Sequence, residues 1–209
     1  MTTTNKFLER VKEHRESKKA AKFEGTLESY LQLLEENKDI AALAHKRLYH
    51  QLISSGITTL DETDDRCHKV FNGETVKVYN YFSPHFFGME KPLEKVMRFL
   101  SSAAMKGEES RQVLLLLGPV GAGKSALIEH IKAGLEQCAP IHVLEGCPVR
   151  EEPLHLIPRS LRAEFEAAYD IKIEGDLCPV CRHRLINEFD GDYTQFPITE
   201  ASFSVRGRK

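Results

Sequence analysis

Apolar residues recur at helical spacing near the start of the chain, after a basic stretch with few large apolar side chains. Residues 6–22 are rich in lysine and arginine, which predicts a solvated helix or an arm that contacts a partner. Thr26 is expected to cap a helix whose apolar residues recur at helical spacing: Leu27, Tyr30, Leu31, Leu33 and Leu34. A second helix is expected over about residues 39–54, ending before Gly56. Together the two predict a small helical hairpin within an N-terminal helical segment, residues 1–60.

A second region, residues 61–209, has a different pattern. Residues 57–75 are polar and acidic, which is typical of a connecting stretch. From Glu90 onward the apolar residues fall at positions i, i+3, i+4 and i+7 and predict a helix with one buried face. These residues are Leu93, Val96, Met97 and Leu100.

Two short apolar runs further on predict buried strands. The strands are expected over residues 112–117, with the apolar run 113–117, and over 141–144, and a helix from Lys124 to about Gln137 is expected between them. A strand, a helix and a strand in this order form a unit with a right-handed crossover and parallel strands. Short helices are then expected over residues 161–169 and 182–189, and weak alternation follows in Phe196, Ile198, Phe203 and Val205.

A glycine-rich octet joins the first of these strands to the helix. The octet has the pattern Gly-x-x-x-x-Gly-Lys-Ser and consists of Gly118, Pro119, Val120, Gly121, Ala122, Gly123, Lys124 and Ser125. Glycines let backbone N–H groups turn toward phosphate oxygens, and the positive end of the following helix favours the same charge. We expect Lys124 to reach the β and γ phosphates and the Ser125 hydroxyl to bind Mg²⁺. The strand before and the helix after disfavour a chance match.

The five cysteines include one closely spaced pair, Cys178-Pro-Val-Cys181. Two thiolates separated by two residues can bind one tetrahedral Zn²⁺, but a second pair of ligands is needed. The set Cys147, His155, Cys178 and Cys181 is the candidate, with His183 close by. Two alternatives stay open: reduced thiols in a turn before a helix, or a redox pair.

Residues around His155 have a competing interpretation. Glu151, Glu152 and His155 could serve in acid–base catalysis, because both residue types titrate usefully when buried. The other interpretation is a helix start, where a glutamate benefits from the positive end of the helix dipole. No catalytic residue can be assigned from the sequence.

Charge and hydropathy exclude some functions. Lys plus Arg number 29 and Asp plus Glu 31, so no net field favours nucleic acid or an anionic membrane. No apolar run approaches the roughly 18 residues that span a bilayer, and the polar N-terminus does not resemble a signal peptide. We therefore expect a cytoplasmic protein that does not bind membranes or nucleic acid.

Four segments carry a resemblance to the N-terminal part of the PrkA-type serine protein kinases of bacteria. They are Phe87-Gly88-Met89-Glu90, the octet, residues 145–158 with the run Glu-Glu-Pro-Leu-His-Leu-Ile-Pro, and Ile173-Glu174-Gly175-Asp176-Leu177. The octet occurs in many unrelated NTPases, whereas the Glu-Glu-Pro-Leu-His-Leu-Ile-Pro run is far more restrictive.

The resemblance implies an α/β fold: an AAA-type P-loop NTPase domain with a parallel sheet and helices on both faces. Here that domain is expected to be partial, over residues 61–209, after the helical segment. The resemblance also implies ATP and Mg²⁺ as cofactors, a protein substrate and assembly into a homo-oligomer. It suggests the segment Phe86, Phe87 and Gly88 as the neighbour of the adenine, although core packing explains Phe86 and Phe87 equally well.

The expected function is phosphoryl transfer from ATP–Mg²⁺ to serine or threonine of a protein by the full-length protein. One alternative is an AAA-type ATPase that drives remodelling or proteolysis of proteins. Another is a non-catalytic nucleotide-binding module. We find neither an acidic strand end that would hold the Mg²⁺ shell nor an arginine for the transition state. We therefore expect this chain to be an N-terminal fragment or a truncated gene product that binds nucleotide weakly and is incomplete as a catalyst.

Overall fold

The computed structural model describes residues 3–20 and 22–202, and it divides into two compact units. The first unit comprises the described residues up to Ala41 together with residues 140–202, and the second comprises residues 42–139. Phe203 and Val205, part of the predicted alternation, lie outside the described residues. The sequence-based division at residue 60 stays a prediction.

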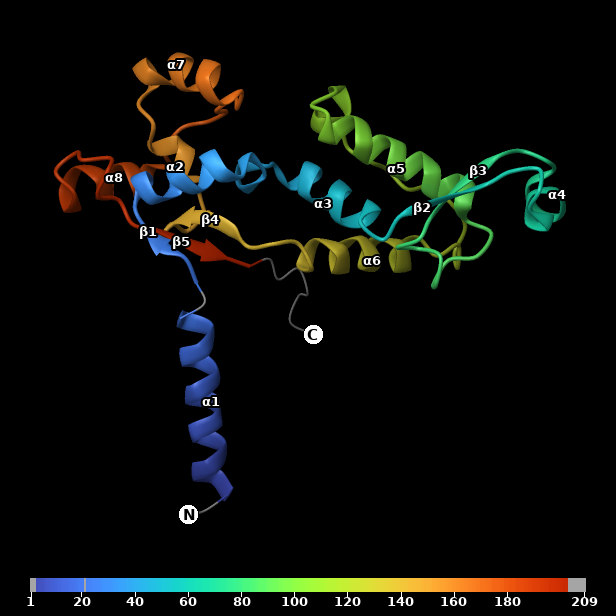
Figure 1. Cartoon of the computed structure of the whole chain (residues 1–209), viewed down its shortest axis with the longest axis horizontal. Coiled ribbons are helices and arrows are strands. Elements are labelled where there is room, and N and C mark those ends of the chain that lie inside the picture. Colours follow the sequence, from blue (N-terminus) through green and yellow to red (C-terminus); the bar gives the residue numbers. More distant parts are fainter. Residues whose placement is uncertain (1–2, 21, 203–209) are drawn as a thin grey trace. The chain divides into compact units, whose positions relative to one another are not determined.

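The first unit contains a small antiparallel sheet, and in sequence its helices lie before and between the strands (Figure 1). In chain order its elements are α1 (Thr3–Ala20), β1 (Glu24–Gly25), α2 (Leu27–Glu36), η1 (Lys38–Ala41), β4 (Ile141–Leu144), η3 (Pro153–Leu156), α7 (Arg159–Tyr169), α8 (Pro179–Glu188) and β5 (Ile198–Ala201). Strand β5 lies between β1 and β4, and Ile198 is opposite Leu144 in the register. The predicted basic helix is α1, and its described side chains are exposed.

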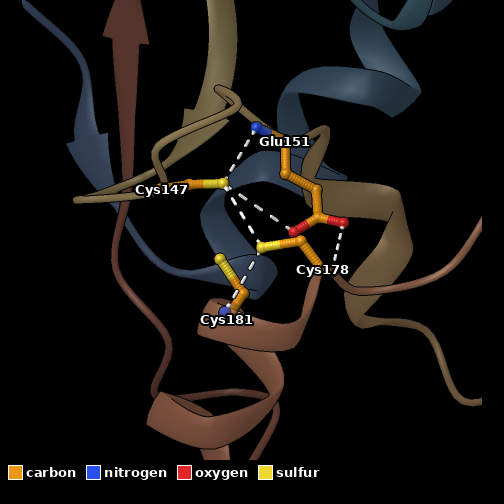
Figure 2. A group of neighbouring side chains, drawn as sticks. All are labelled: Cys147, Glu151, Cys178 and Cys181. Carbon is orange, nitrogen blue, oxygen red and sulfur yellow. Dashed lines mark hydrogen bonds between the residues drawn. The ribbon is translucent and has the colours of Figure 1, made fainter.

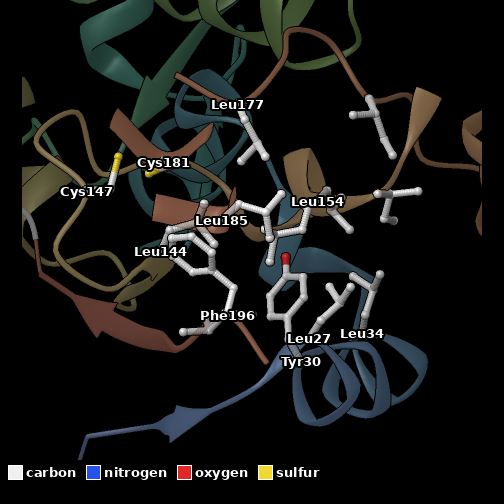
Figure 3. Packing of buried hydrophobic residues seen from close by; sticks show 14 residues of the cluster. Leu27, Tyr30, Leu34, Leu144, Cys147, Leu154, Leu177, Cys181, Leu185 and Phe196 are labelled. Carbon is white, nitrogen blue, oxygen red and sulfur yellow. The ribbon is translucent and has the colours of Figure 1, made fainter. Parts of the chain in front are cut away.

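The core of the first unit joins segments from both ends of the chain (Figure 3). The helix predicted after Thr26 is α2, and it contributes Leu27, Tyr30 and Leu34, the last of which is 0% exposed. Leu185 from α8 and Phe196, which precedes β5, pack into the same cluster. The apolar face of α2 is thereby removed from water, and burial of apolar surface is the main force that stabilises such a unit.

The second unit consists of helices and a two-stranded antiparallel hairpin (Figure 1). Its elements are α3 (Ala44–Ile53), β2 (Ile57–Leu60), α4 (Asp65–Phe71), β3 (Val76–Tyr79), α5 (Glu90–Ala104), η2 (Glu108–Arg111) and α6 (Lys124–Glu136). Helix α3 packs against both α5 and α6. The buried face predicted for α5 is confirmed, because Leu93, Val96, Met97 and Leu100 are all in the core.

The helix predicted over residues 39–54 is interrupted. Residues 38–41 form the short 3₁₀ helix η1, and α3 begins at Ala44. The Arg47 side chain donates a hydrogen bond from Nε to the carbonyl oxygen of Ala42 at 2.9 Å. This carbonyl lies at the break between η1 and α3, and the side chain of Arg47 gives it a hydrogen-bond partner there. The two helices predicted to form a hairpin belong to different units. Helix α2 packs into the core of the first unit through Leu34, and α3 packs into the core of the second unit through Leu52.

Residues 57–75, predicted to be a connecting stretch, contain regular structure. Strand β2 pairs with β3, and α4 lies between them in sequence. Asp64 starts α4 by accepting a hydrogen bond from the backbone N–H of Arg66 at 2.8 Å. Leu60, Phe71 and Val76 bury one side of this hairpin in a small cluster. The acidic composition of this segment did not predict these elements, because the apolar contacts that stabilise them are few and join residues that are separated in sequence.

The predicted parallel sheet is not found in the described part of the chain. Strand β4 forms as expected, but it pairs antiparallel with β5. Residues 113–117 carry no strand assignment, and Leu115 is 72% exposed. A strand needs neighbours for its N–H and C=O groups, and β4, the predicted partner of this run, belongs to the other unit. Apolar content therefore does not suffice to make residues 113–117 a strand here.

Candidate functional site

The glycine-rich octet forms a tight loop that leads directly into α6. Gly121 and Gly123 have φ angles of +82° and +75°, a backbone conformation that residues with a Cβ rarely adopt. A Cβ on Gly123 would lie 3.4 Å from the sulfur of Met89. Gly123 is the N-cap of α6, so the predicted start of this helix at Lys124 is confirmed.

The backbone donors of this loop are available to an anion. Leu127 N–H donates to the Gly123 carbonyl at 2.9 Å and is the first helical N–H with a partner. Within residues 3–20 and 22–202, no acceptor lies in hydrogen-bond range of the N–H groups of Gly121, Gly123, Lys124 or Ser125. These donors stand at the positive end of a helix of 13 residues, which is the arrangement that binds phosphate in proteins. The loop therefore fits a nucleotide phosphate.

The two side chains predicted to handle phosphate and Mg²⁺ lie in one pocket. The pocket has a volume of about 400 Å³ and is lined by Leu114, Leu116, Lys124, Ser125, Ile128 and Glu129. The Lys124 ammonium donates to the carbonyl oxygens of Gly118 at 2.8 Å and Pro119 at 2.6 Å. Lys124 thus closes over its own loop. Of the remaining members of the octet, Val120 is exposed, and the backbone N–H of Ala122 donates to the Pro119 carbonyl at 3.4 Å.

The segment that precedes α5 approaches the loop from another part of the second unit. Phe86 is buried in the core, where its ring packs edge-on against His130 with ring centres 5.2 Å apart. Its neighbour Phe87 is 82% exposed, and Gly88 has a φ angle of +71°. Phe86 and Met89 both lie within 4 Å of the Cβ position of Gly123. Phe86 therefore has a packing role, whereas Phe87 and Gly88 stay candidates for contact with a base.

Three of the four predicted zinc ligands come together in the first unit (Figure 2). Cys147 lies in the turn after β4, Cys178 is the N-cap of α8 and Cys181 lies in the first turn of that helix. The sulfur atoms of Cys147 and Cys178 are 3.9 Å apart, so no disulfide joins them. Burial raises the pKa of the Cys181 thiol, and its hydrogen bonds with the other two cysteines act in the same direction.

The fourth member of this cluster is Glu151, which the ligand set predicted from the sequence did not include. Its side chain is 4% exposed, and its Oε2 lies 3.8 Å from the Cys147 sulfur. Its Oε1 accepts a hydrogen bond from the backbone N–H of Cys178 at 2.7 Å and lies 3.1 Å from Nδ1 of the His155 ring. Glu151 stands four residues after Cys147, a spacing that could have drawn attention to it. Its burial, however, is visible only in the fold.

His155 is held beside the cluster and is not part of it. Its Nε2 lies 2.9 Å from the carbonyl oxygen of Glu174, which can only accept, so this nitrogen donates. Its Nδ1 faces Glu151, so the pairing of carboxylate and imidazole considered for acid–base work does exist. His155 also lines a pocket of about 430 Å³ together with three arginines. One of these, Arg159, lowers the pKa of Asp176 to about 2 through its hydrogen bond to that carboxylate.

Among the described residues, no helix combines the length and the apolar character that a membrane span requires.

Comparison with known proteins gives one family. The family model described as the PrkA AAA domain matches residues 25–209. The chain is 35% identical over 203 residues to a Bacillus subtilis protein named ATP-dependent protease PrkA, covering 94% of this chain and 30% of that protein. It is 33% identical over 202 residues to the Escherichia coli K12 protein named serine/threonine kinase YeaG, covering 92% of this chain and 31% of that protein.

A third relative is shorter. An uncharacterized protein in the gldA 5′ region of Geobacillus stearothermophilus is 30% identical over 105 residues, which cover 50% of this chain and 95% of that protein. No solved structure matches the chain. The chain spans about 30% of the length of the PrkA and YeaG relatives. With a family match over most of its length, the chain belongs to the PrkA AAA domain family.

Proposed function

We propose that residues 118–125 bind the phosphates of ATP and that the chain is the nucleotide-binding part of an ATP-dependent, PrkA-like enzyme. The observation that carries this proposal is the set of backbone N–H groups at the start of α6, which have no acceptor in the described residues. Four such donors beside a lysine and a serine form a recognised phosphate cradle.

The side chains of the loop have distinct roles in this proposal. The Lys124 ammonium turns from the carbonyls of Gly118 and Pro119 to the β and γ phosphate oxygens. The Ser125 hydroxyl supplies one oxygen ligand to Mg²⁺, an ion that keeps most of its waters. Mg²⁺ neutralises charge on the phosphates when bound. Phe87, exposed and next to the flexible Gly88, is proposed to contact the adenine.

For the full-length protein we propose phosphoryl transfer to serine or threonine of a protein substrate. A relative that is named as a serine/threonine kinase supports this reaction. ATP-dependent proteolysis is a second candidate, because the relative from Bacillus subtilis is named as an ATP-dependent protease. Both reactions require ATP at the loop, so both depend on Lys124.

We further propose that residues 113–117 form a strand of a parallel, AAA-type sheet in the full-length protein, that this protein is cytoplasmic, and that it assembles with copies of itself. The support for the strand is five consecutive apolar residues directly before a phosphate loop. These side chains are largely exposed in this chain, and a sheet or a neighbouring subunit would cover them.

Titration calorimetry of ATP–Mg²⁺ against this chain tests the site. Lys124→Ala should weaken binding at least about tenfold, since a hydrogen bond to a charged group contributes about 1.5–3 kcal/mol. Lys95→Ala is the matched control, because Lys95 is an exposed lysine of the same unit. Equal affinities for Lys124→Ala and the unmodified chain would refute the phosphate site.

A second experiment separates the two reactions in the full-length protein. Incubation with ATP labelled on the γ phosphate and with a mixed peptide substrate should yield labelled phosphoserine or phosphothreonine. New peptide termini without label would favour proteolysis. If ATP binds and neither product forms, and the ATP is not hydrolysed, the non-catalytic nucleotide-binding module is the correct interpretation.

A further inference from the structure

We propose that Cys147, Glu151, Cys178 and Cys181 bind one structural Zn²⁺ ion in the first unit. One atom from each residue, three sulfurs and a carboxylate oxygen, lies within 4.8 Å of every other (Figure 2). Cys147, Glu151 and Cys181 are buried and Cys178 is half-buried. The ligands come from the turn after β4 and from the start of α8, so the ion joins two segments that are distant in sequence.

The distances suit a tetrahedral ion. With Zn–S bonds of about 2.3 Å, two sulfurs on one tetrahedral Zn²⁺ are about 3.8 Å apart, and a sulfur and a carboxylate oxygen are about 3.6 Å apart. The sulfurs of Cys147 and Cys178 are 3.9 Å apart, and Cys147 Sγ is 3.8 Å from Glu151 Oε2. Every separation is at most 4.8 Å, so none has to contract by more than about 1 Å to match these values.

The surroundings hold the ligands in place. The backbone N–H of Glu151 points at the Cys147 sulfur, and that of Cys181 points at the Cys178 sulfur, both at 3.4 Å. Such donors stabilise thiolates, and α8 adds the positive end of a helix beside Cys178. One oxygen of Glu151 accepts from the Cys178 N–H and contacts the His155 ring, and the other lies 3.8 Å from the Cys147 sulfur. Hydrogen bonds of this kind orient the ligands of metal sites.

The donor set selects the metal and its role. Thiolates favour Zn²⁺ over Ca²⁺ and Mg²⁺, which prefer oxygen ligands. Four protein ligands fill every position of a tetrahedral ion, so the site is structural and has no open position for a substrate. On binding, the three thiols release their protons to the solvent. His155, a candidate ligand from the sequence, instead orients Glu151.

Metal analysis of the purified chain, reconstituted with ZnCl₂ and desalted, tests the proposal. We expect about one zinc per chain in the unmodified protein and in Cys138→Ala, a control at a half-buried cysteine outside the cluster. Cys178→Ala should lose at least about tenfold in zinc affinity. A zinc content near zero in the unmodified chain, or the same affinity in Cys178→Ala, would overturn the proposal.

Two measurements on folded protein guard against a variant that does not fold. X-ray absorption of the zinc-loaded chain should give three sulfur neighbours at about 2.3 Å and one oxygen at about 2.0–2.2 Å. In Glu151→Cys the oxygen should be replaced by a fourth sulfur. A zinc shell of nitrogen and oxygen alone would refute the ligand set. A disulfide-linked peptide pair of Cys147 and Cys178 in freshly purified, metal-free protein would support the redox interpretation instead.

Discussion

The carboxylate of Glu151 accepts a hydrogen bond from the backbone N–H of Cys178 at 2.7 Å, across 27 positions of sequence. This contact connects the loop after β4 to the start of α8. The same loop is closed by the N–H of Leu144, which donates to the Glu151 carbonyl at 2.9 Å. Glu151 is therefore fixed through both its side chain and its backbone.

Replacing Glu151 by alanine should destabilise the first unit. The N–H of Cys178 would lose its acceptor and the His155 ring would lose a polar contact, and an unsatisfied backbone N–H away from water costs about 1–3 kcal/mol. Urea unfolding in the presence of a chelator measures this loss without a contribution from bound metal. Glu164→Ala, at an exposed position of α7, should change stability by less than about 0.5 kcal/mol. Equal stability of the two variants would contradict the buried role of Glu151.

Leu34→Ala should create a cavity in the core of the first unit. Leu34 is completely buried on α2, and truncation of such a leucine costs about 2–5 kcal/mol. Urea unfolding should show a lower midpoint with an unchanged dependence on denaturant. Leu161→Ala, at an exposed position of α7, is the control and should have little effect. A similar loss in both variants would mean that α2 does not pack as described.

Ser125→Ala should weaken the dependence of ATP binding on Mg²⁺. The hydroxyl is the proposed protein ligand of the ion, whereas the backbone donors of the loop remain in the variant. Calorimetry with and without Mg²⁺ should therefore show a smaller gain in affinity from Mg²⁺ than in the unmodified chain. Ser110→Ala, a serine of the same unit whose hydroxyl binds the Gly107 carbonyl, should keep the full gain. An unchanged gain in Ser125→Ala would remove this serine from the magnesium site.

The stability of the second unit should fall as the pH drops below about 6.5. Burial lowers the pKa of His130, and the neighbouring His85 adds to the effect. Above the unfolded value of about 6.5 both states are neutral and the histidine has no effect on stability. Below it the unfolded chain takes up the proton first, so stability is lost as the pH falls from the unfolded pKa toward the lower folded pKa, where the loss levels off.

His130→Phe keeps the ring and removes the titration, so it tests this dependence. The variant should show a smaller decrease in the midpoint of thermal unfolding between pH 7.5 and about pH 5. His50→Phe, at an exposed position of α3, should keep the decrease of the unmodified chain. Identical pH profiles for His130→Phe and the unmodified chain would mean that His130 does not control the loss.

Local rules determined a large part of this protein from sequence alone. The octet predicted a glycine-rich turn and a helix from Lys124; the helix begins there, and Gly121 and Gly123 have the positive φ angles that favour glycine. The spacing of Leu93 and Met97 identified the buried face of α5 correctly. The two-residue gap placed Cys178 and Cys181 close together at the start of a helix. Each of these features depends on residues within a few positions of one another, where backbone geometry leaves few choices.

Tertiary structure decided the long-range pairings. The antiparallel partner of β4, the separate burial of α2 and α3, and the approach of Met89 to Gly123 all join distant segments. The same holds for the meeting of Cys147 and Glu151 with the cysteine pair of α8. An apolar run or a cysteine can satisfy its local pattern with many partners. The partner it takes depends on which arrangement buries the most apolar surface while every buried N–H and carboxylate keeps a hydrogen bond.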